Sequence, residues 1–380
     1  MKLKNFALIT ILFLLIKSGI CQTSISINPT GYFIQQGGYA DVVFCVNNVT
    51  NLHSHSIIVK FDNNIVKILS ITKGPFMPSN YFGYQPTLPL VRDSVTVDQA
   101  IFGSTTVSGS GIIFTIRFQG LINGVSPLLF SSFKLWDQNG NLISAIAYGG
   151  NITVGNVIVN TKIFLQGPFN TSTGNMNTSL CSSGYLPLSQ PYNVSPWNYS
   201  GTENVPVWFY NVKSTIVDWV LIEIRTTPSG PYISRKVAFI KDDGSIVDYT
   251  DGSTLGAAFT DLSPGNYYII IRHRNHLAVM SSGTVALNTS SALYDFSTGL
   301  SQFYGGDAKM LTFGSTQMYG LYAGDANGNG VVNAADRNMA IQQTGMSGYL
   351  SADFSLNGVV NALDRSISIL NTGKSSFILN

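Results

Sequence analysis

The feature that most constrains this chain is a 21-residue stretch that occurs twice near its C-terminal end. DANGNGVVNAADRNMAIQQTG spans residues 325–345, and DFSLNGVVNALDRSISILNTG spans residues 353–373. Aligned without a gap, 12 of the 21 positions are identical. A short unit written twice predicts one supersecondary element used twice, with the two copies packed on each other.

Each copy begins with twelve residues that carry oxygen donors at alternate positions. They are Asp325, Asn327, Asn329, Val331, Asn333 and Asp336 in the first copy, and Asp353, Ser355, Asn357, Val359, Asn361 and Asp364 in the second. A loop that wraps around calcium presents oxygens at positions 1, 3, 5, 7, 9 and 12, and position 7 uses its backbone carbonyl, so Val is tolerated there. Gly330 and Gly358 at position 6 permit the sharp turn. The spacing predicts two calcium ions, one in each loop.

The ligand charge of these loops sets how tightly they would hold an ion. Each loop brings two carboxylates, and both copies end in Asp where the usual calcium loop ends in Glu. A low ligand charge predicts modest affinity, with a Kd of roughly 10⁻⁵ to 10⁻³ M. The alternative is a pair of Asn-Gly turns that hold no ion.

An apolar run of helical length follows the Asp-Arg pair of each copy. RNMAIQQTG and RSISILNTG both end on Gly, which suits the C-terminal end of a helix. Each copy therefore predicts a loop followed by a helix. We expect Ala340 with Ile341, and Ile367 with Ile369 and Leu370, to form one buried face.

Two loop-helix calcium motifs in tandem, over residues 321–374, resemble a type I dockerin. The resemblance implies calcium-dependent folding and a cohesin-type protein module as the partner. The partner-contact positions of that family fall on Ala334, Ala335, Arg337, Ala362, Leu363 and Arg365. Cellulosomal dockerins often carry Ser-Thr where this chain has Ala-Ala and Ala-Leu, so the resemblance implies the fold but puts a standard cellulosomal partner in doubt.

The rest of the chain has the composition of a β protein. Charged residues are 11% of the sequence, against about 25% on average, and aromatic residues are 12%. Residues 22–155 and 156–320 consist of short β-branched and aromatic stretches divided by turn signals, which predicts two β-sandwich domains. The predicted fold class is mainly β: two sandwiches, a small α-helical calcium-binding domain at 321–374, and a tail at 375–380.

Two stretches of the first sandwich resemble a cohesin. HSIIVKFDNNIVKILSITKG at residues 55–74 and GIIFTIRFQG at residues 111–120 are similar to strands of that family. The resemblance implies a jelly-roll sandwich, which cohesins share with a class of carbohydrate-binding modules. Whether this domain binds a protein or a sugar stays open.

The second domain contains a long polar loop, roughly residues 168–205, with aromatic side chains in it. Tyr192, Trp197 and Tyr199 lie in the segment PYNVSPWNY. Rings on a loop can stack on sugar faces, so these three are candidates for carbohydrate binding; alternatively they plug the edge of their own sandwich. Glu203 and Glu223 are the only glutamates, and nothing marks a catalytic pair of carboxylates, so we expect no enzyme, with residues 156–320 the least constrained part.

The N-terminal residues 1–21 have the pattern of a secretory signal peptide. Lys2 and Lys4 precede an apolar run from Phe6 to Ile16, which is too short to span a bilayer. We expect an extracellular protein without a membrane span, and a lipid anchor on Cys21 is the cell-surface alternative. The net charge of +2 gives no case for nucleic-acid binding.

Together these features predict a secreted, non-catalytic adaptor in polysaccharide catabolism. Its dockerin would bind a cohesin-type partner, and its N-terminal module would bind a carbohydrate or a protein. A cohesin-like module and a dockerin in one chain also permit self-association. The alternatives are a component that degrades polysaccharide with the middle domain as glycoside hydrolase, and a cell-surface adhesin.

Overall fold

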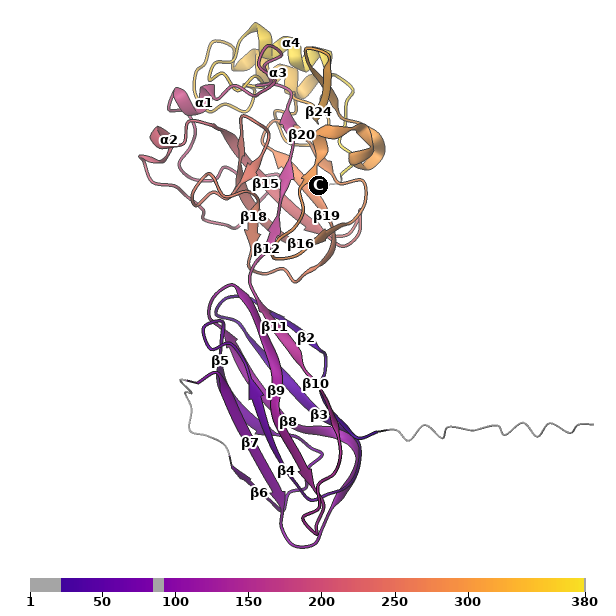
Figure 1. Cartoon of the computed structure of the whole chain (residues 1–380). Coiled ribbons are helices and arrows are strands. Elements are labelled where there is room, and N and C mark those ends of the chain that lie inside the picture. The colour runs from indigo at the N-terminus through magenta and orange to yellow at the C-terminus, as the bar shows by residue number, and fades with distance from the viewer. Residues whose placement is uncertain (1–21, 85–91, 379–380) are drawn as a thin grey trace, which may run out of the picture. The chain divides into compact units, whose positions relative to one another are not determined.

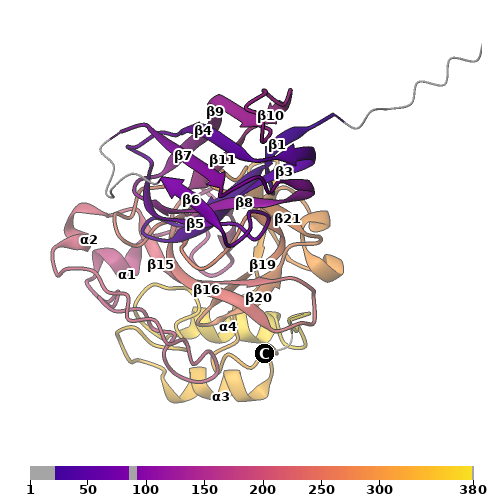
Figure 2. The same ribbon diagram turned by 90° about the horizontal axis from the view of Figure 1, so that it is seen from below.

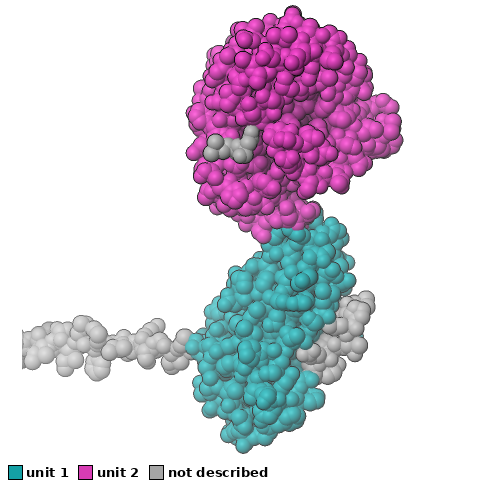
Figure 3. Space-filling view, turned by 180° about the vertical axis from the view of Figure 1, so that it is seen from behind, with its two compact units in different colours: residues 1–154 teal, residues 155–380 magenta. Residues whose placement is uncertain are grey.

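The structure is a computed structural model that describes residues 22–84 and 92–378. The predicted signal peptide and Cys21 lie outside the described residues. Within the described ranges, no helix has the length and apolar character needed to cross a membrane. The chain divides into two compact units, with the boundary between Val154 and Gly155 (Figure 3).

The first unit is a sandwich of two β-sheets (Figure 1). One sheet has the strand order β10-β1-β3-β8-β5, and the other has the order β2-β11-β9-β4-β7-β6. The strands are β1 (Ser24–Ile27), β2 (Gly31–Ile34), β3 (Tyr39–Leu52), β4 (Ser54–Lys60), β5 (Val66–Lys73), β6 (Tyr81–Tyr84), β7 (Ser94–Ile101), β8 (Val107–Gly120), β9 (Gly124–Trp136), β10 (Ile146–Tyr148) and β11 (Gly150–Val154).

The core of this sandwich follows from strict alternation along its strands. In β7 every second residue is buried, as expected where successive side chains point to opposite faces. Phe44 in β3 stacks on Phe114 in β8, with 4.6 Å between ring centroids, and contacts Phe130 in β9 of the opposite sheet at 5.9 Å. The prediction of a mainly β chain with a sandwich at its N-terminal end is confirmed.

The second unit is built on one large antiparallel sheet with the order β17-β16-β15-β19-β20, and β21 also pairs with β19. Its elements are β12 (Val157–Val159), β13 (Thr161–Lys162), β14 (Phe164–Leu165), α1 (Ser179–Ser182), α2 (Phe209–Val212), β15 (Ile216–Arg225), β16 (Tyr232–Lys241), β17 (Ile246–Val247), β18 (Ala257–Phe259), β19 (Gly265–His273), β20 (His276–Met280), β21 (Val285–Leu287), β22 (Tyr294–Asp295), three short 3₁₀ turns at Phe296–Thr298, Leu300–Gln302 and Tyr304–Gly306, β23 (Lys309–Phe313), β24 (Thr316–Leu321), α3 (Ala334–Gln342) and α4 (Ala362–Leu370).

The middle block has one large sheet and several smaller ones where a second sandwich was expected. The smaller sheets have two or three strands each. Every residue of β15 is buried, so both faces of the large sheet are covered along this strand. Part of that cover is the loop around residues 187–199: the Tyr192 hydroxyl donates to the Trp219 carbonyl at 2.8 Å, and the Trp219 indole N–H donates to the Pro187 carbonyl at 3.0 Å.

The helices α3 and α4 lie side by side in both ribbon views (Figures 1 and 2). Residues 321–374, which were expected as a separate domain, belong to the same compact unit as residues 156–320. The small core of this C-terminal block consists of Ala323, Ala326, Ala340, Ala352, Phe354, Val360 and Ile367.

The predicted buried face of the two helices is only partly correct. Ala340 and Ile367 are buried, whereas Ile341, Ile369 and Leu370 are 55%, 56% and 78% exposed. The reason is that Phe354 and Val360, which belong to the second loop, fill the space against the helices. Each nine-residue helix then has room to bury only a narrow stripe of its surface.

Candidate functional site

The first calcium loop is wrapped around two carboxylates by backbone hydrogen bonds. Asp325 accepts the N–H groups of Asn329 and Gly330 at 3.1 and 2.9 Å. Asp336 accepts those of Asn327 and Asn333 at 3.3 and 2.9 Å. The loop is therefore closed at both ends by the side chains at positions 1 and 12.

The second loop repeats these bonds position by position. Asp353 accepts the N–H groups of Asn357 and Gly358 at 3.1 and 2.8 Å, and Asp364 accepts those of Ser355 and Asn361, both at 2.9 Å. Position 6 has φ of 83° in the first loop and 85° in the second, a left-handed conformation that favours Gly. The repeated sequence thus forms a repeated structure.

Position 9 of each loop also starts the helix that follows. The Asn333 side-chain oxygen accepts the Ala335 N–H at 2.7 Å, and the Asn361 oxygen accepts the Leu363 N–H at 2.8 Å. Each helix has a capping box, because the position-12 Asp bonds back to the N-cap backbone. An oxygen used in this way suits a position that often reaches calcium through water.

The four loop carboxylates are buried, and burial disfavours their charged form unless a cation is present. Burial, and to a smaller extent the neighbouring Asp336 carboxylate, raise the pKa of Asp325 to about 7. Burial and Asp364 likewise raise the pKa of Asp353 to about 6. Two buried acids that repel each other need a counter-charge, and a divalent cation supplies it.

The donor set also decides which cation fits. In the described ranges no group of three or more His, Cys, Asp or Glu side chains gathers as a metal cluster. Each loop instead combines two carboxylates with amide and carbonyl oxygens, and the second loop adds the hydroxyl of Ser355. An all-oxygen set of low charge suits calcium rather than zinc or a transition metal. The residues present therefore fit the predicted ion.

The two halves interlock through short backbone pairings. Val332 in the first loop donates to the Lys374 carbonyl and accepts from Gly373, both at 2.9 Å. Val360 in the second loop donates to the Met346 carbonyl at 3.0 Å and accepts from Gly345 at 2.8 Å. Each loop is thus paired with the segment that follows the other helix, so neither half is complete alone.

A buried polar cluster joins the C-terminal block to the large sheet. Arg274, in the turn between β19 and β20, donates to Asp218 at 3.0 Å and to the Leu350 carbonyl, and it lies 4.0 Å from the ring centroid of Tyr349. The Tyr349 hydroxyl donates to Asp218 at 2.7 Å. Burial alone would raise the pKa of Asp218, but Arg274 and His273 hold it below its usual value. We call this set of residues the junction cluster.

The junction cluster also reaches the second calcium loop directly. Asn275 donates from its side chain to the Asp353 carbonyl at 2.7 Å and accepts the Gly324 N–H at 3.0 Å on its backbone carbonyl. In the sequence, RHRNH at 272–276 has the pattern of ordinary polar strand residues. Its contacts with the C-terminal block were therefore not predicted. A run of five polar residues at the end of an apolar strand was the available clue.

The long loop of the middle block covers the first calcium loop. A Cβ added to Gly328 would lie 2.9 Å from Trp197 and 3.0 Å from Pro196, and Gly328 has φ of 68°. A side chain has no room there, so the ring of Trp197 rests against the loop backbone.

The structure separates the three aromatic candidates for sugar binding. Tyr192 has no exposed surface and bonds to the sheet, so it is a core residue and the interpretation as a sugar platform must be corrected. Trp197 is half-buried, with its ring edge-on to Tyr192 at 5.3 Å. Tyr199 is half-buried and donates its hydroxyl to Glu203 at 2.5 Å.

The predicted partner-contact residues lie at the start of α3 and α4. Ala334, Ala335, Arg337, Ala362 and Leu363 are exposed, and Arg365 is half-buried with its guanidinium donating to the Thr344 hydroxyl at 2.9 Å. Ile341, Ile369 and Leu370 on the same two helices are exposed as well, and we call these nine residues together the helix surface.

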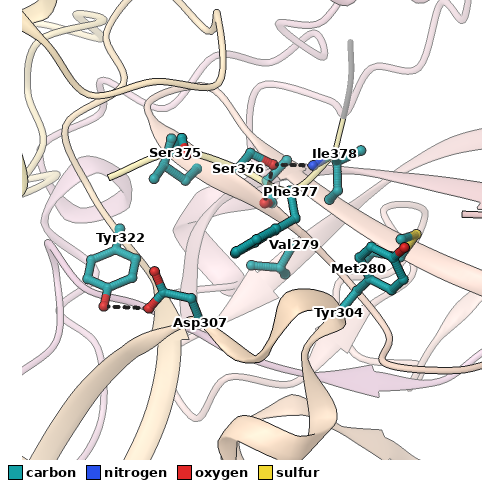
Figure 4. A pocket seen from close by; sticks show the side chains of 11 residues that line it. Val279, Met280, Tyr304, Asp307, Tyr322, Ser375, Ser376, Phe377 and Ile378 are labelled. Atoms are coloured by element: carbon teal, nitrogen blue, oxygen red, sulfur yellow. Dashed lines mark hydrogen bonds between the residues drawn. The ribbon is translucent and has the colours of Figure 1, made fainter. Parts of the chain in front are cut away.

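The segment after α4 is packed on β20 (Figure 4). The Ser376 hydroxyl donates to the Ala278 carbonyl at 2.8 Å, and Ile378 is buried with Ile270 and Met280. The cavity left there is about 20 Å³, room for water only. The predicted tail therefore anchors the C-terminal block to the sheet over its described residues.

Comparison with known proteins gives a likeness for one part of the chain. No protein-family model matches the sequence, and no curated protein matches it. Among solved structures, cohesin modules are similar to about 35% of the chain. A non-cellulosomal cohesin from the archaeon Archaeoglobus fulgidus is 18% identical with a TM-score of 0.30, over 35% of this chain and 91% of that chain.

Two bacterial structures give similar values. A type I cohesin–dockerin complex from Clostridium thermocellum is 17% identical with a TM-score of 0.31, over 35% of this chain and 99% of that chain. A type II cohesin module of an adaptor scaffoldin from Acetivibrio cellulolyticus is 12% identical with a TM-score of 0.30, over 34% and 88%. At such TM-scores the sandwich assignment rests on strand pairing alone, and the dockerin resemblance of residues 321–374 stays a prediction.

Proposed function

We propose that this chain is a secreted, non-catalytic adaptor that docks onto a cohesin-type protein module through its C-terminal block when calcium is bound. The observation that carries the proposal is the repetition of one set of hydrogen bonds around two pairs of buried carboxylates. In each pair the first Asp lies in the loop and the second lies in the first turn of the helix that follows.

Calcium would act here as a counter-charge and not as a reagent. Asp325 with Asp336, and Asp353 with Asp364, would hold one ion each, together with the oxygens between them. Because the C-terminal core is small and rich in Ala, the bound ions would add directly to its folding free energy. One site at a hundred times its Kd contributes about 2.7 kcal/mol.

The helix surface supplies the docking chemistry in this proposal. Leu363 and Leu370 on α4 and Ile341 on α3 expose apolar area of the kind that interfaces bury. Arg337 and Arg365 add two positive charges to it. A partner with an apolar centre and an acidic rim would match this surface.

The N-terminal sandwich is the other binding end of the adaptor. On its second sheet a shallow cavity of about 310 Å³ is lined by Ser54, Ser56, Phe82, Asp98 and Trp136, among other residues. Aromatic rings beside polar groups suit either a protein loop or a polysaccharide chain. With a cohesin-like module and a dockerin-like block in one chain, two copies of the protein could also bind each other.

The two alternative functions are a glycoside hydrolase, with its active site in the middle block, and an adhesin. A glycoside hydrolase would need the middle block to supply its carboxylates, and Glu223 accepts from Arg225 at 2.6 Å and from Arg272 at 2.9 Å. Burial raises the pKa of Glu223, but these arginines hold it below its usual value, which disfavours a general acid. An adhesin would bind host glycans with no need for the helix surface.

Calcium titration of the full chain by calorimetry, followed by circular dichroism, tests the proposal. Two ions bound, with helix gained, support it if the double variant Asp325→Asn/Asp353→Asn loses both signals. Binding to an immobilised type I cohesin that disappears on chelation would then identify the partner class. Absence of calcium binding at millimolar concentration would refute the adaptor proposal, and hydrolysis of polysaccharide lost in Glu223→Gln would favour the enzyme.

A further inference from the structure

A cavity of about 270 Å³ lies on the large sheet of the second unit, outside the calcium loops. Its wall is made by Pro196, Trp197 and Asn198 of the long loop and by Glu223, Arg225, Tyr232, Arg235 and Arg272 of β15, β16 and β19. The strand register brings these charges together, since Glu223 is opposite Arg235 and Leu221 is opposite Arg272.

The wall carries three guanidinium groups and one carboxylate. Glu223 is engaged on both oxygens, by Arg225 on one and by Arg272 on the other. Glu203, which is bonded to Tyr199, does not line the cavity. The cavity is therefore positively charged, and an anion is the ligand that it would attract.

Arg235 gives the most direct sign of a missing ligand. It donates from Nη2 to the Trp197 carbonyl at 2.6 Å, and its guanidinium lies over the ring of Tyr232 at 4.6 Å. Its Nε is buried and has no hydrogen-bond partner within the described structure. A buried donor without a partner is unfavourable, and an acceptor on a ligand would relieve that cost.

A second cavity of about 320 Å³ shares Trp197 with the first. It is lined by Arg274, Asn327, Met339 and Tyr349, among other residues. Arg274 is only 5% exposed, and its Nη2 also has no hydrogen-bond partner within the described structure. One tryptophan thus borders two cavities, and each cavity contains a buried guanidinium nitrogen that lacks an acceptor.

We infer that these two cavities form a binding site for an acidic oligosaccharide, with carboxylates facing Arg235 and Arg274 and sugar rings against Trp197. Planar guanidinium groups match carboxylates, and a tryptophan face suits the C–H face of a pyranose. Each volume lies near the lower end for ligand pockets, which fits about one sugar unit. Asn198 and Asn327 offer amide groups to ring hydroxyls.

Calorimetric titration of the full chain with a glucuronic-acid-containing tetrasaccharide tests this site, with calcium present throughout. The matched control ligand is the same tetrasaccharide with its carboxyl groups reduced to alcohols. We expect binding of the acidic form and at least about tenfold weaker binding of the reduced form, the cost of losing one charge-assisted pair. Equal binding of both would overturn the inference.

Variants locate the site. Arg235→Lys keeps the charge but loses the planar fork, so we expect at least about fivefold weaker binding without loss of the folded circular dichroism spectrum. Trp197→Phe should weaken binding of the acidic form to a smaller degree. The control Arg117→Gln removes an exposed arginine of the N-terminal sandwich and should leave binding unchanged.

Three outcomes would refute the site: no binding of the acidic tetrasaccharide, binding unchanged in Arg235→Lys, or equal binding of a poly-glutamate peptide. The last would assign the cavities to an acidic protein segment. Failure of this site is distinguishable from failure of the proposed adaptor function, because cohesin binding uses the helix surface and the variants tested here leave Asn327 and the other loop ligands unchanged.

Discussion

The N-terminal sandwich and the C-terminal block are stabilised in different ways. Among the described residues, the sandwich core contains twenty-six buried apolar side chains, including Phe44, Phe114 and Phe118. The core of the C-terminal block contains seven, four of which are Ala. Hydrophobic stabilisation scales with buried apolar area, so the sandwich is expected to hold by itself. The C-terminal block packs on the large sheet through the junction cluster, and in the proposed function it also depends on bound calcium.

Because of this contrast, we expect the stability of the second unit to depend on the calcium concentration. Calcium concentration would alter the C-terminal block and leave the sandwich unchanged. Hydrogen exchange measured by mass spectrometry resolves the two, because each peptide reports its own part of the same chain.

Removal of calcium with a chelator is expected to have the largest effect. Two sites at a hundred times their Kd contribute about 5 kcal/mol together, which is much of the stability of a small domain. Amides of α3 and α4 should therefore lose protection, and those of β3 and β8 should keep it. Equal loss in both units, or no loss in either, would contradict the contrast drawn here.

Asp218→Asn in the junction cluster should destabilise the second unit by roughly 3–5 kcal/mol. The substitution leaves Arg274 buried without its carboxylate, and breaking one side of a buried pair is costly. Denaturant unfolding followed through exchange of peptides from β15 and α4 measures the change. The control is Asp41→Asn, which breaks an exposed pair with Arg117 in the sandwich and should have a far smaller effect.

The sandwich has its own pH dependence through His55. Burial lowers the pKa of this histidine from 6.5 to about 4, although the Gln99 side chain bonds to its ring at 2.9 Å. The folded state then binds fewer protons than the unfolded state, so stability is complete above pH 6.5 and is lost as the pH falls towards 4. We expect a loss of about 3 kcal/mol over that range, from about 1.4 kcal/mol per unit.

His55→Gln provides the control for this prediction. The variant has no group that titrates at this position, so the slope of sandwich stability between pH 6.5 and 4 should flatten. An unchanged slope in the variant would assign the pH dependence to other groups.

Leu363→Ser on the helix surface should have the smallest effect on stability and a large effect on docking. Leu363 is 53% exposed, and surface substitutions usually change stability by less than about 0.5 kcal/mol. Binding to a cohesin, measured by calorimetry, should weaken by at least about tenfold, as for an interface hot spot. Leu129→Ser in β9, also 53% exposed, is the matched control and should retain full binding.

The local features of the fold could be predicted from the sequence because they depend on neighbouring residues. Alternation along β7 and the left-handed turns at Gly330 and Gly358 are examples. The hydrogen bonds that close the loops join residues at most nine positions apart. The spacing of oxygen side chains in the sequence is therefore enough to predict them.

The features that were missed depend on contacts between distant segments. Arg274 bonds to a carbonyl 76 residues away, and nothing near Arg274 in the sequence indicates that carbonyl. Tyr192 is buried because its loop covers a sheet formed later in the chain. Leu370 is exposed because Phe354 and Val360 of the second loop occupy the core beside the helices. Helix periodicity gives the apolar positions but not which of them meets a neighbour.

The cross-pairing of the two loops has a consequence for how the protein is made. The backbone partners of Val332 in the first loop are Gly373 and Lys374. During synthesis the first half of the repeat emerges before these residues, so its backbone pairing waits until the second half has followed. A chain that ends between the two copies would therefore lack the partners that complete its first loop.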